Sequence, residues 1–241
     1  NLLNMATGHQ KYADFDLKTN KYHKNANSNT VEFHLKKGVF KNSKKAKSKY
    51  QYTNFLSNLL LNYVWFKSGG EFQNLLDEIF VDKAKIENDV WFLKMNDRTI
   101  KMNNRNNTIL KEYEVKDEDG PLRYSFRASR YDYLRIARAM LDDWQNDTCV
   151  GKYLKTIREL RISKNNKWKD DNSHDLNSKS YAGKFHTNYS GMAKRNVMGM
   201  SGYGGQSIII DFDKGRINVI NSIHTDYNWR KIAHSVIKKG K

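Results

Sequence analysis

Apolar residues recur along this chain at a spacing that places them on one face of a helix, chiefly in its first two thirds. The segments with this spacing are 55–67, 72–80, 133–144, 154–160 and 229–237. Gly69-Gly70 gives the first of them a stop signal, and Ser129 with Asp132 three residues later gives the third a helix cap. A short helix is also expected at 1–7, where a glycine follows.

A different pattern follows near the end of the chain, where residues 208–212 form an apolar, β-branched run. Such a run favours a buried strand, and a turn signal at 213–215 separates it from a second predicted strand at 216–223. Residues 181–189 predict a further strand, which gives three neighbouring antiparallel strands. Helices first, then strands and a last helix predict an α+β fold in which that helix lies on the antiparallel sheet.

Three long polar stretches lie between these segments. Residues 11–49 are expected to form a long loop around one extended piece at 31–35, residues 94–120 to be irregular, and residues 164–180 to form a connection. The chain is interpreted as one domain, with a mostly helical region at 1–160 and the sheet with its C-terminal helix at 161–241.

The composition indicates a folded protein with a basic surface. Of 241 residues, 38% are hydrophobic and 12% aromatic, enough for a sizeable core. The net charge of +17 would suit nucleic acid, but the lysines are scattered among asparagines, so a solvated surface is the preferred interpretation. No apolar run is long enough to span a membrane, Cys149 is the only cysteine, and the histidines have no metal-binding spacing, so neither metal nor cofactor is expected.

Two features carry candidate chemistry. Glycines crowd the segment 202–205 just before the apolar strand, where a substrate can lie along bare backbone; a bulge or tight bend is the structural alternative. Tyr52 and Asn54 are two residues apart, so in an extended segment they point the same way. A phenol can pass protons and an amide can hold a carbonyl, although a structural tyrosine fits the same pattern.

These features resemble the motifs of the serine β-lactamase and penicillin-binding-protein superfamily. The nearest resemblance is to its class C β-lactamase-like branch of esterases, D-amino-peptidases and 6-aminohexanoate-dimer hydrolases. The similar segments follow the family's order over nearly the whole chain: Leu2–Gly8, Tyr50–Phe55, Ser68–Phe72, Ser129–Met140, Gly151–Lys152 and Gly202–Gln206. Tyr50–Phe55 looks like the Tyr-x-Asn motif, and Gly202–Gln206 is similar to a variant of the third motif, which is Lys-Thr-Gly in β-lactamases.

The resemblance implies a β-lactamase-like fold and a role for each matched residue. Tyr52 would be the general base of acylation and the acid for the leaving group, while Asn54 would hold the substrate's acyl side chain and the catalytic lysine. The Gly205 N–H would be one of two oxyanion-hole donors. Gly202, Tyr203 and Gly204 would line the substrate groove.

The chain departs from the family pattern in two places. Gly202 stands where β-lactamases have a lysine, which puts recognition of a β-lactam carboxylate in doubt and points to an ester or amide substrate. The family's Ser-x-x-Lys should precede the segment Leu2–Gly8, and this sequence begins with that segment, at Asn1, so the nucleophile is expected in a missing N-terminal segment. The one Ser-x-x-Lys present, Ser235–Lys238, follows every other motif and is interpreted as chance.

The preferred function is therefore a bacterial serine hydrolase fragment, inactive alone, that acts on a small-molecule or peptide substrate once joined to the missing segment. The alternatives are a non-catalytic relative that binds a ligand in the same groove and a basic nucleic-acid-binding protein. The aromatic residues fall mostly at helical core spacings rather than on a stacking surface, which argues against nucleic acid. The sequence favours neither the periplasm nor the cytoplasm.

Overall fold

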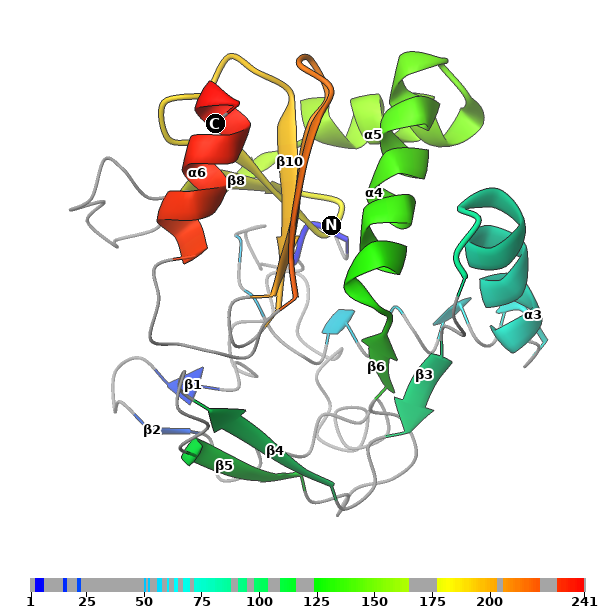
Figure 1. Ribbon diagram of the computed structural model, residues 1–241, viewed down its shortest axis with the longest axis vertical. Helices are drawn as coiled ribbons and strands as arrows, with labels where there is room; N and C mark the ends of the chain where they lie inside the picture. Colours follow the sequence, from blue (N-terminus) through cyan, green and yellow to red (C-terminus); the bar gives the residue numbers. More distant parts are fainter. Residues whose placement is uncertain are drawn as a thin grey trace, which may run out of the picture. The chain divides into compact units, whose positions relative to one another are not determined.

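The structure of the chain is a computed structural model, and its elements are labelled in Figure 1. It describes residues 3–6, 15–16, 21–22, 50, 52, 56–57, 60, 63–64, 67–69, 72–87, 91–94, 98–103, 109–115, 124–164, 177–202, 206–221 and 229–240. The chain forms two compact units. The first comprises residues 1–76, 91–100 and 113–127, and the second comprises residues 77–90, 101–112 and 128–241.

The first unit contains short paired strands and a helical segment. Strand β1 (Phe15–Asp16) pairs antiparallel with β2 (Lys21–Tyr22), and β3 (Trp91–Lys94) pairs antiparallel with β6 (Tyr124–Arg127). Within the segment 55–67, the described residues are helical, as predicted. The helix ends where the Ser68 N–H donates to the Val64 carbonyl at 2.9 Å and Gly69 adopts a φ of 64°, which confirms the stop signal.

The next helical segment is confirmed, but its geometry changes along its length. Helix α3 (Phe72–Leu76) continues directly as a π-helix, η3 (Asp77–Lys83). Leu76 is buried, whereas Ile79 is 40% exposed. Because a π-helix has more residues per turn than an α-helix, residues after Leu76 leave the face that a 3.6-residue spacing assigns to them. The N-terminal residues Leu3, Asn4 and Met5 form a turn rather than the expected short helix.

The prediction that residues 94–120 are irregular was wrong. They contain β4 (Arg98–Asn103) and β5 (Ile109–Val115), which pair with each other. Ile100 and Met102 alternate with charged or polar residues in β4, which is the period of a strand. The many lysines and asparagines around this alternation made the segment strongly polar, and a strongly polar segment predicts a loop. The extended piece expected at 31–35 lies outside the described residues.

The second unit is built on a six-stranded sheet in the order β12-β11-β10-β9-β8-β7. The strands are β7 (Ile162–Ser163), β8 (Ser178–Ala182), β9 (Phe185–Tyr189), β10 (Val197–Ser201), β11 (Ser207–Asp211) and β12 (Arg216–Ile220). Every neighbouring pair is antiparallel, as expected for this region. The predicted hairpin of 208–212 with 216–223 is therefore confirmed.

The single strand expected at 181–189 was wrong, because the segment forms the hairpin β8–β9. Its turn is Gly183-Lys184, with φ values of 54° and 77°. Two residues with positive φ form the tight turn whose twist matches that of the flanking strands. Lysine rarely adopts a positive φ, so the residue types here do not predict the turn, and one strand was expected in place of two.

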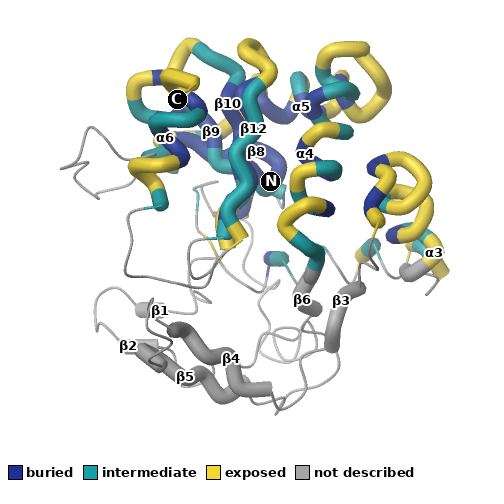
Figure 2. Tube along the Cα trace, in the orientation of Figure 1, coloured by how far each residue is buried: buried dark blue, intermediate teal, exposed yellow. Residues whose placement is uncertain are grey.

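Helices cover both faces of this sheet (Figure 1). On one face, α4 (Arg130–Gln145) and α5 (Cys149–Glu159) pack on Met198, Ile208 and Ile210. On the other face, α6 (Trp229–Lys239) packs on Val197 and Ile209. Successive residues of β10 and β11 thus enter opposite cores, and Figure 2 shows these strands buried between the helices. The expected α+β class, with the last helix on an antiparallel sheet, is confirmed.

The helix boundaries follow their capping residues. The Ser129 hydroxyl accepts from the Asp132 N–H at 3.0 Å and donates to the Asp132 carboxylate at 2.8 Å, which confirms the predicted cap of α4. Helix α5 begins earlier than the expected 154–160, because Thr148 caps it by accepting from the Gly151 N–H at 3.1 Å. In α6, Ala233 and Ile237 are buried as expected, but Ile232 is 51% exposed.

A buried carboxylate links the sheet to the end of α6. Asp211 is fully buried and forms a salt bridge with Arg195. The same Asp211 accepts from the Asp213 and Lys214 N–H groups at 3.1 Å each, which holds the β11–β12 turn. Arg195 in turn donates to the Ile237 carbonyl at 2.9 Å, near the C-terminus of α6, where carbonyls lack helical partners.

We expect Asp211→Ala to lower the free energy of unfolding by about 3–5 kcal/mol, because it leaves Arg195 without its anion and the turn without its acceptor. Urea unfolding followed by circular dichroism measures the change. Asp142→Ala is the matched control, because Asp142 pairs with Arg138 at 2.8 Å on the exposed side of α4. An exposed pair contributes less than about 1 kcal/mol, so equal losses in the two variants would contradict the role of Asp211.

Gly151 permits the close contact between α4 and α5. A Cβ at this position would lie 1.9 Å from the Asp143 carbonyl oxygen, a backbone atom that cannot move without shifting α4. We expect Gly151→Ala to cost about 1–3 kcal/mol or more by overpacking, measured as a fall in the urea midpoint. Lys152→Ala, at the neighbouring exposed position, should stay within about 0.5 kcal/mol of the parent chain. An unchanged urea midpoint in Gly151→Ala would show that α4 and α5 can move apart with little loss of stability.

Candidate functional site

The glycine-rich segment lies in the connection between two central strands. Ser201 ends β10 and pairs with Ser207, the first residue of β11. Between them, the Gly202 N–H donates to the Gln206 carbonyl at 2.8 Å, which closes the turn. Gly202 therefore lies one residue beyond the end of β10, opposite Gln206, and its place along a substrate groove stays a prediction. Tyr203, Gly204 and Gly205 lie outside the described residues.

Gly202 is exposed, and its lack of a side chain shapes the turn. A Cβ there would lie 2.8 Å from the Gln206 Oε1 atom, so glycine lets the Gln206 side chain fold against the turn. Paired strands fix the two described ends of this connection, Gly202 and Gln206, at one end of the sheet.

Two polar side chains with buried oxygen atoms lie on the strands next to this turn. Ser207 pairs with Ile220 and Asn218 pairs with Ile209, which places both side chains on the face of the sheet that α6 covers. The Ser207 Oγ and the Asn218 Oδ1 have no hydrogen-bond partner among the described residues. A buried polar atom without a partner is energetically costly, so these two oxygen atoms could accept hydrogen bonds from a ligand.

Tyr52, the predicted general base, is 56% exposed. Tyr50, two residues away, is half-buried. Its burial raises the pKa of the Tyr50 phenol, and the nearby Tyr52 raises this pKa by a smaller amount. Asn54 lies outside the described residues. The family resemblance also implies that the Tyr52 hydroxyl lies within roughly 10 Å of the Gly205 nitrogen, on the opposite wall of one cleft. Tyr52 belongs to the first unit and Gly205 lies outside the described residues, so this stays a prediction.

The Ser-x-x-Lys at Ser235–Lys238 lies in the last turns of α6. Ser235 is half-buried and Lys238 is exposed. Lys238 extends towards the loop after β9, where a Cβ built on Gly191 would lie 2.9 Å from its Nζ atom. The two residues of this motif thus belong to a surface helix, and the interpretation of the motif as chance stays a prediction.

The structure also brings together three residues that the sequence reasoning missed. Lys164 contacts the Ser178 hydroxyl, its Nζ atom lies 2.6 Å from the His186 Nδ1 atom, and the Ser178 Oγ lies 3.3 Å from the same nitrogen. We call these residues the Lys164 cluster. Lys164 and Ser178 lie within the stretch 164–180, which was expected to be only a polar connection, and no local pattern joins them to His186. Only the pairing of β7, β8 and β9 makes them neighbours.

The environment of His186 keeps its imidazole neutral. Burial lowers its pKa to about 3, with the nearby Lys164 and Arg230 cations contributing in the same direction. The ring of Tyr181 meets it edge-on, with centroids 5.2 Å apart. At neutral pH one ring nitrogen therefore stays available as a hydrogen-bond acceptor.

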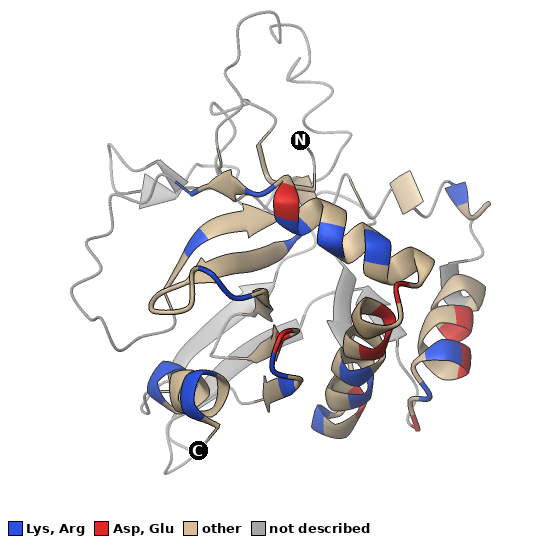
Figure 3. Ribbon diagram, turned by 90° about the horizontal axis from the view of Figure 1, so that it is seen from above, with Lys and Arg blue, Asp and Glu red and all other residues tan. Residues whose placement is uncertain are grey.

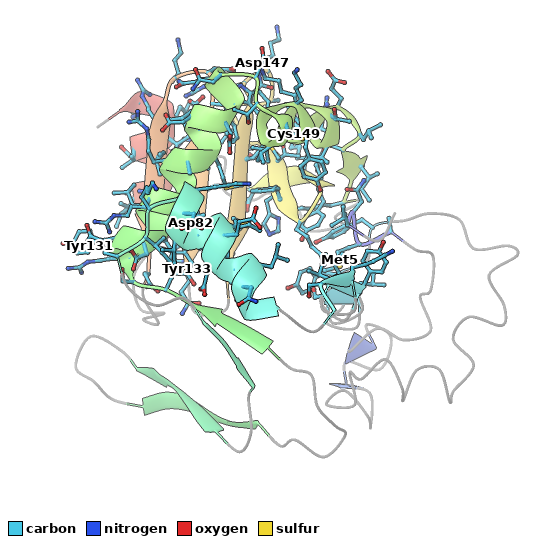
Figure 4. All side chains as sticks on the ribbon, turned by 90° about the vertical axis from the view of Figure 1, so that its right-hand side faces the viewer. Met5, Asp82, Tyr131, Tyr133, Asp147 and Cys149 are labelled. Carbon is cyan, nitrogen blue, oxygen red and sulfur yellow. The ribbon has the colours of Figure 1, made fainter. Side chains whose placement is uncertain are left out.

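Other groups in the described ranges give no comparable cluster. Those ranges hold no set of three His, Cys, Asp or Glu side chains suited to a metal ion, and each of their helices is too short or too polar to cross a lipid bilayer. Lys and Arg are spread over α4, α5 and α6, with acidic residues among them on α4 (Figure 3). Cys149 is exposed at the start of α5, beside the turn that carries Asp147 (Figure 4).

Comparison with known proteins adds no assignment: no protein-family model, curated protein or solved structure matches this chain. The resemblance to class C β-lactamase-like hydrolases therefore stays a hypothesis.

The depressed pKa of His186 makes stability depend on pH. Below pH 6.5 the unfolded chain binds a proton at this histidine, whereas the folded protein binds it only near pH 3. Stability should therefore fall as pH decreases from 6.5 towards 3, with a loss from His186 of roughly 1–2 kcal/mol between pH 7 and pH 5. Urea midpoints at both pH values measure it. His186→Gln should reduce the fall by that amount, and an unchanged fall would show that His186 titrates normally.

Proposed function

We propose that this chain is part of a serine hydrolase of the class C β-lactamase-like type. The reaction is acyl transfer from an ester or amide to a serine, followed by hydrolysis of the acyl-serine by water. The proposal assigns the nucleophile to a Ser-x-x-Lys motif that precedes Leu2. The fold proposed with it is β-lactamase-like, a finer description than the α+β class.

The observation that carries the proposal is the position of the Gly202–Gln206 turn. It joins β10 to β11 in the middle of an antiparallel sheet that α6 covers on one face and α4 with α5 on the other. The proposal takes the oxyanion donor from this glycine-rich connection, because a backbone donor between two anchored strand ends would need little reorganisation when the substrate binds. Exposed Gly202 leaves room for a substrate beside it.

The proposal gives the remaining residues the roles that the resemblance implies. Tyr52 takes the proton from the nucleophile and returns it to the leaving group, and its exposure is compatible with access by a substrate. Asn54 binds the acyl side chain. The Gly205 N–H stabilises the oxyanion, with Tyr203 and Gly204 along the groove.

The substrate is an ester or amide rather than a β-lactam. Gly202 replaces the lysine that would bind a β-lactam carboxylate, and a glycine offers no cation at that place. A turn without side chains instead recognises a substrate through backbone hydrogen bonds.

The test compares this chain with the same chain extended at its N-terminus by its own coding sequence. This chain alone should hydrolyse neither nitrophenyl esters nor nitrocefin with catalytic turnover, and the extended chain should hydrolyse the esters. Tyr52→Phe in the extended chain should lower turnover about a hundredfold or more, because proton transfer is lost. Tyr131→Phe is the control, since Tyr131 is a 60% exposed tyrosine near the start of α4 (Figure 4) and the proposal gives it no role.

An upstream sequence without Ser-x-x-Lys would remove the hydrolase proposal and leave the non-catalytic ligand-binding protein as the better reading. Full turnover in Tyr52→Phe would remove the assigned base even if hydrolysis occurs. Intact-mass detection of an acyl adduct, lost when the upstream serine is mutated, would identify the nucleophile.

A further inference from the structure

The Lys164 cluster is held in place by the edge of the sheet. The Lys164 N–H donates to the Lys179 carbonyl at 3.0 Å, which extends the pairing of β7 with β8 by one residue. Ser178 is the first residue of β8, and His186 belongs to β9, opposite Tyr181. Lys164 follows β7, Ser178 begins β8 and His186 lies in β9, so three neighbouring segments of the sheet bring the side chains together.

The contacts within the cluster have the order found around an activated nucleophile. A hydroxyl that is to attack a carbonyl needs a base within hydrogen-bond reach, and the base needs a third group that orients it. Ser178 supplies the hydroxyl, and Lys164 touches it. His186 accepts from Lys164 across 2.6 Å, which fixes the direction of the lysine amine. All three residues are half-buried rather than sealed in the core, so a small reagent can reach them.

We propose that Ser178 is a second acyl-accepting serine, with Lys164 as its base and His186 as the residue that positions Lys164. Its substrate class is a small activated ester. This site goes beyond the proposed function, which uses a different serine, Tyr52 and the Gly202–Gln206 turn.

The reaction step balances without any further reactant. The amine form of Lys164 accepts the Ser178 hydroxyl proton while the Ser178 Oγ bonds to the ester carbonyl carbon. The tetrahedral intermediate then expels the alkoxide or phenolate, which takes the proton from Lys164. An acyl-serine, a free alcohol and an unprotonated Lys164 result.

Neighbouring serines provide a structural contrast. Ser190 lies just after β9 on the same sheet, but its hydroxyl donates to the Asn177 carbonyl at 3.2 Å. A backbone carbonyl oxygen is too weak a base to remove the hydroxyl proton of Ser190. If surface position alone made a serine reactive, Ser190 and Ser178 would react alike.

The experiment treats the full 241-residue chain with a fluorophosphonate probe and, separately, with nitrophenyl acetate, and follows the intact mass. The fluorophosphonate loses fluoride and the ester loses nitrophenolate, so each leaves one group on the serine. We expect one adduct per chain, mapped to Ser178 by peptide mass spectrometry. Ser178→Ala should abolish it, and Lys164→Met should slow its formation at least a hundredfold. Ser190→Ala should leave it unchanged.

His186→Gln provides the readout for positioning. An amide oxygen can still accept from Lys164, so this variant should keep more reactivity than His186→Ala, although both remove the imidazole. Equal rates in the two variants would contradict a positioning role. Circular dichroism of each variant checks that the sheet has folded. A loss of adduct in a folded variant then reports a change in the reactivity of Ser178, not unfolding.

Several outcomes would overturn the proposal: no adduct on the folded parent chain, an adduct that survives Ser178→Ala, or an acetyl group that resists hydroxylamine. Hydroxylamine cleaves an ester of serine but not an amide, so resistance would mean direct acetylation of a lysine. Failure here is distinguishable from failure of the proposed function. Tyr52→Phe should leave the Ser178 adduct unchanged, whereas it should stop turnover by the extended chain.

Discussion

The second unit depends on the burial of β11 on both faces. All five residues from Ser207 to Asp211 are buried, with Ile208 and Ile210 in one core and Ile209 in the other. Burying each isoleucine contributes roughly 1.5–3 kcal/mol, and both helical layers use the same strand. A register slip of one residue would exchange the two faces and place the Asp211 carboxylate in the core beneath α4 and α5. The register of the central strands is therefore fixed from both sides, and so is the turn that leads into β11.

Much of this architecture could be read from the sequence because its signals are local. The apolar run at 208–212, the turn after it, the Ser129 cap and the Gly69 stop each depend on residues within a few positions of one another. The signals failed where tertiary context decides. In β4 and β5 the strand period was hidden by polar neighbours. In the β8–β9 turn, Lys184 has a φ of 77°, which its residue type does not predict. In η3, a change in helical period moved Ile79 outwards.

The candidate sites divide in the same way. The Gly202–Gln206 turn was noticeable in the sequence because glycines next to an apolar run are a local feature, although its place between two strands was not foreseen. The Lys164 cluster could not be predicted from the sequence, because strand pairing brings its members together and no short motif connects them. Chemistry assembled across strands of a sheet leaves no trace in a single stretch of sequence. Chemistry assembled within one turn does.

The order of the strands has a consequence for how this unit folds. From β7 to β12, each strand pairs with the strand that precedes or follows it in the chain. Such a meander has mainly short-range contacts, and domains with low contact order fold faster than those that join distant segments, because less loop entropy is lost before contacts form. Helix α4 packs on these strands from well before them in the chain, and α6 packs on them from after them. The sheet can therefore form between consecutive strands at a modest cost in loop entropy, whereas its two cores also need the helices.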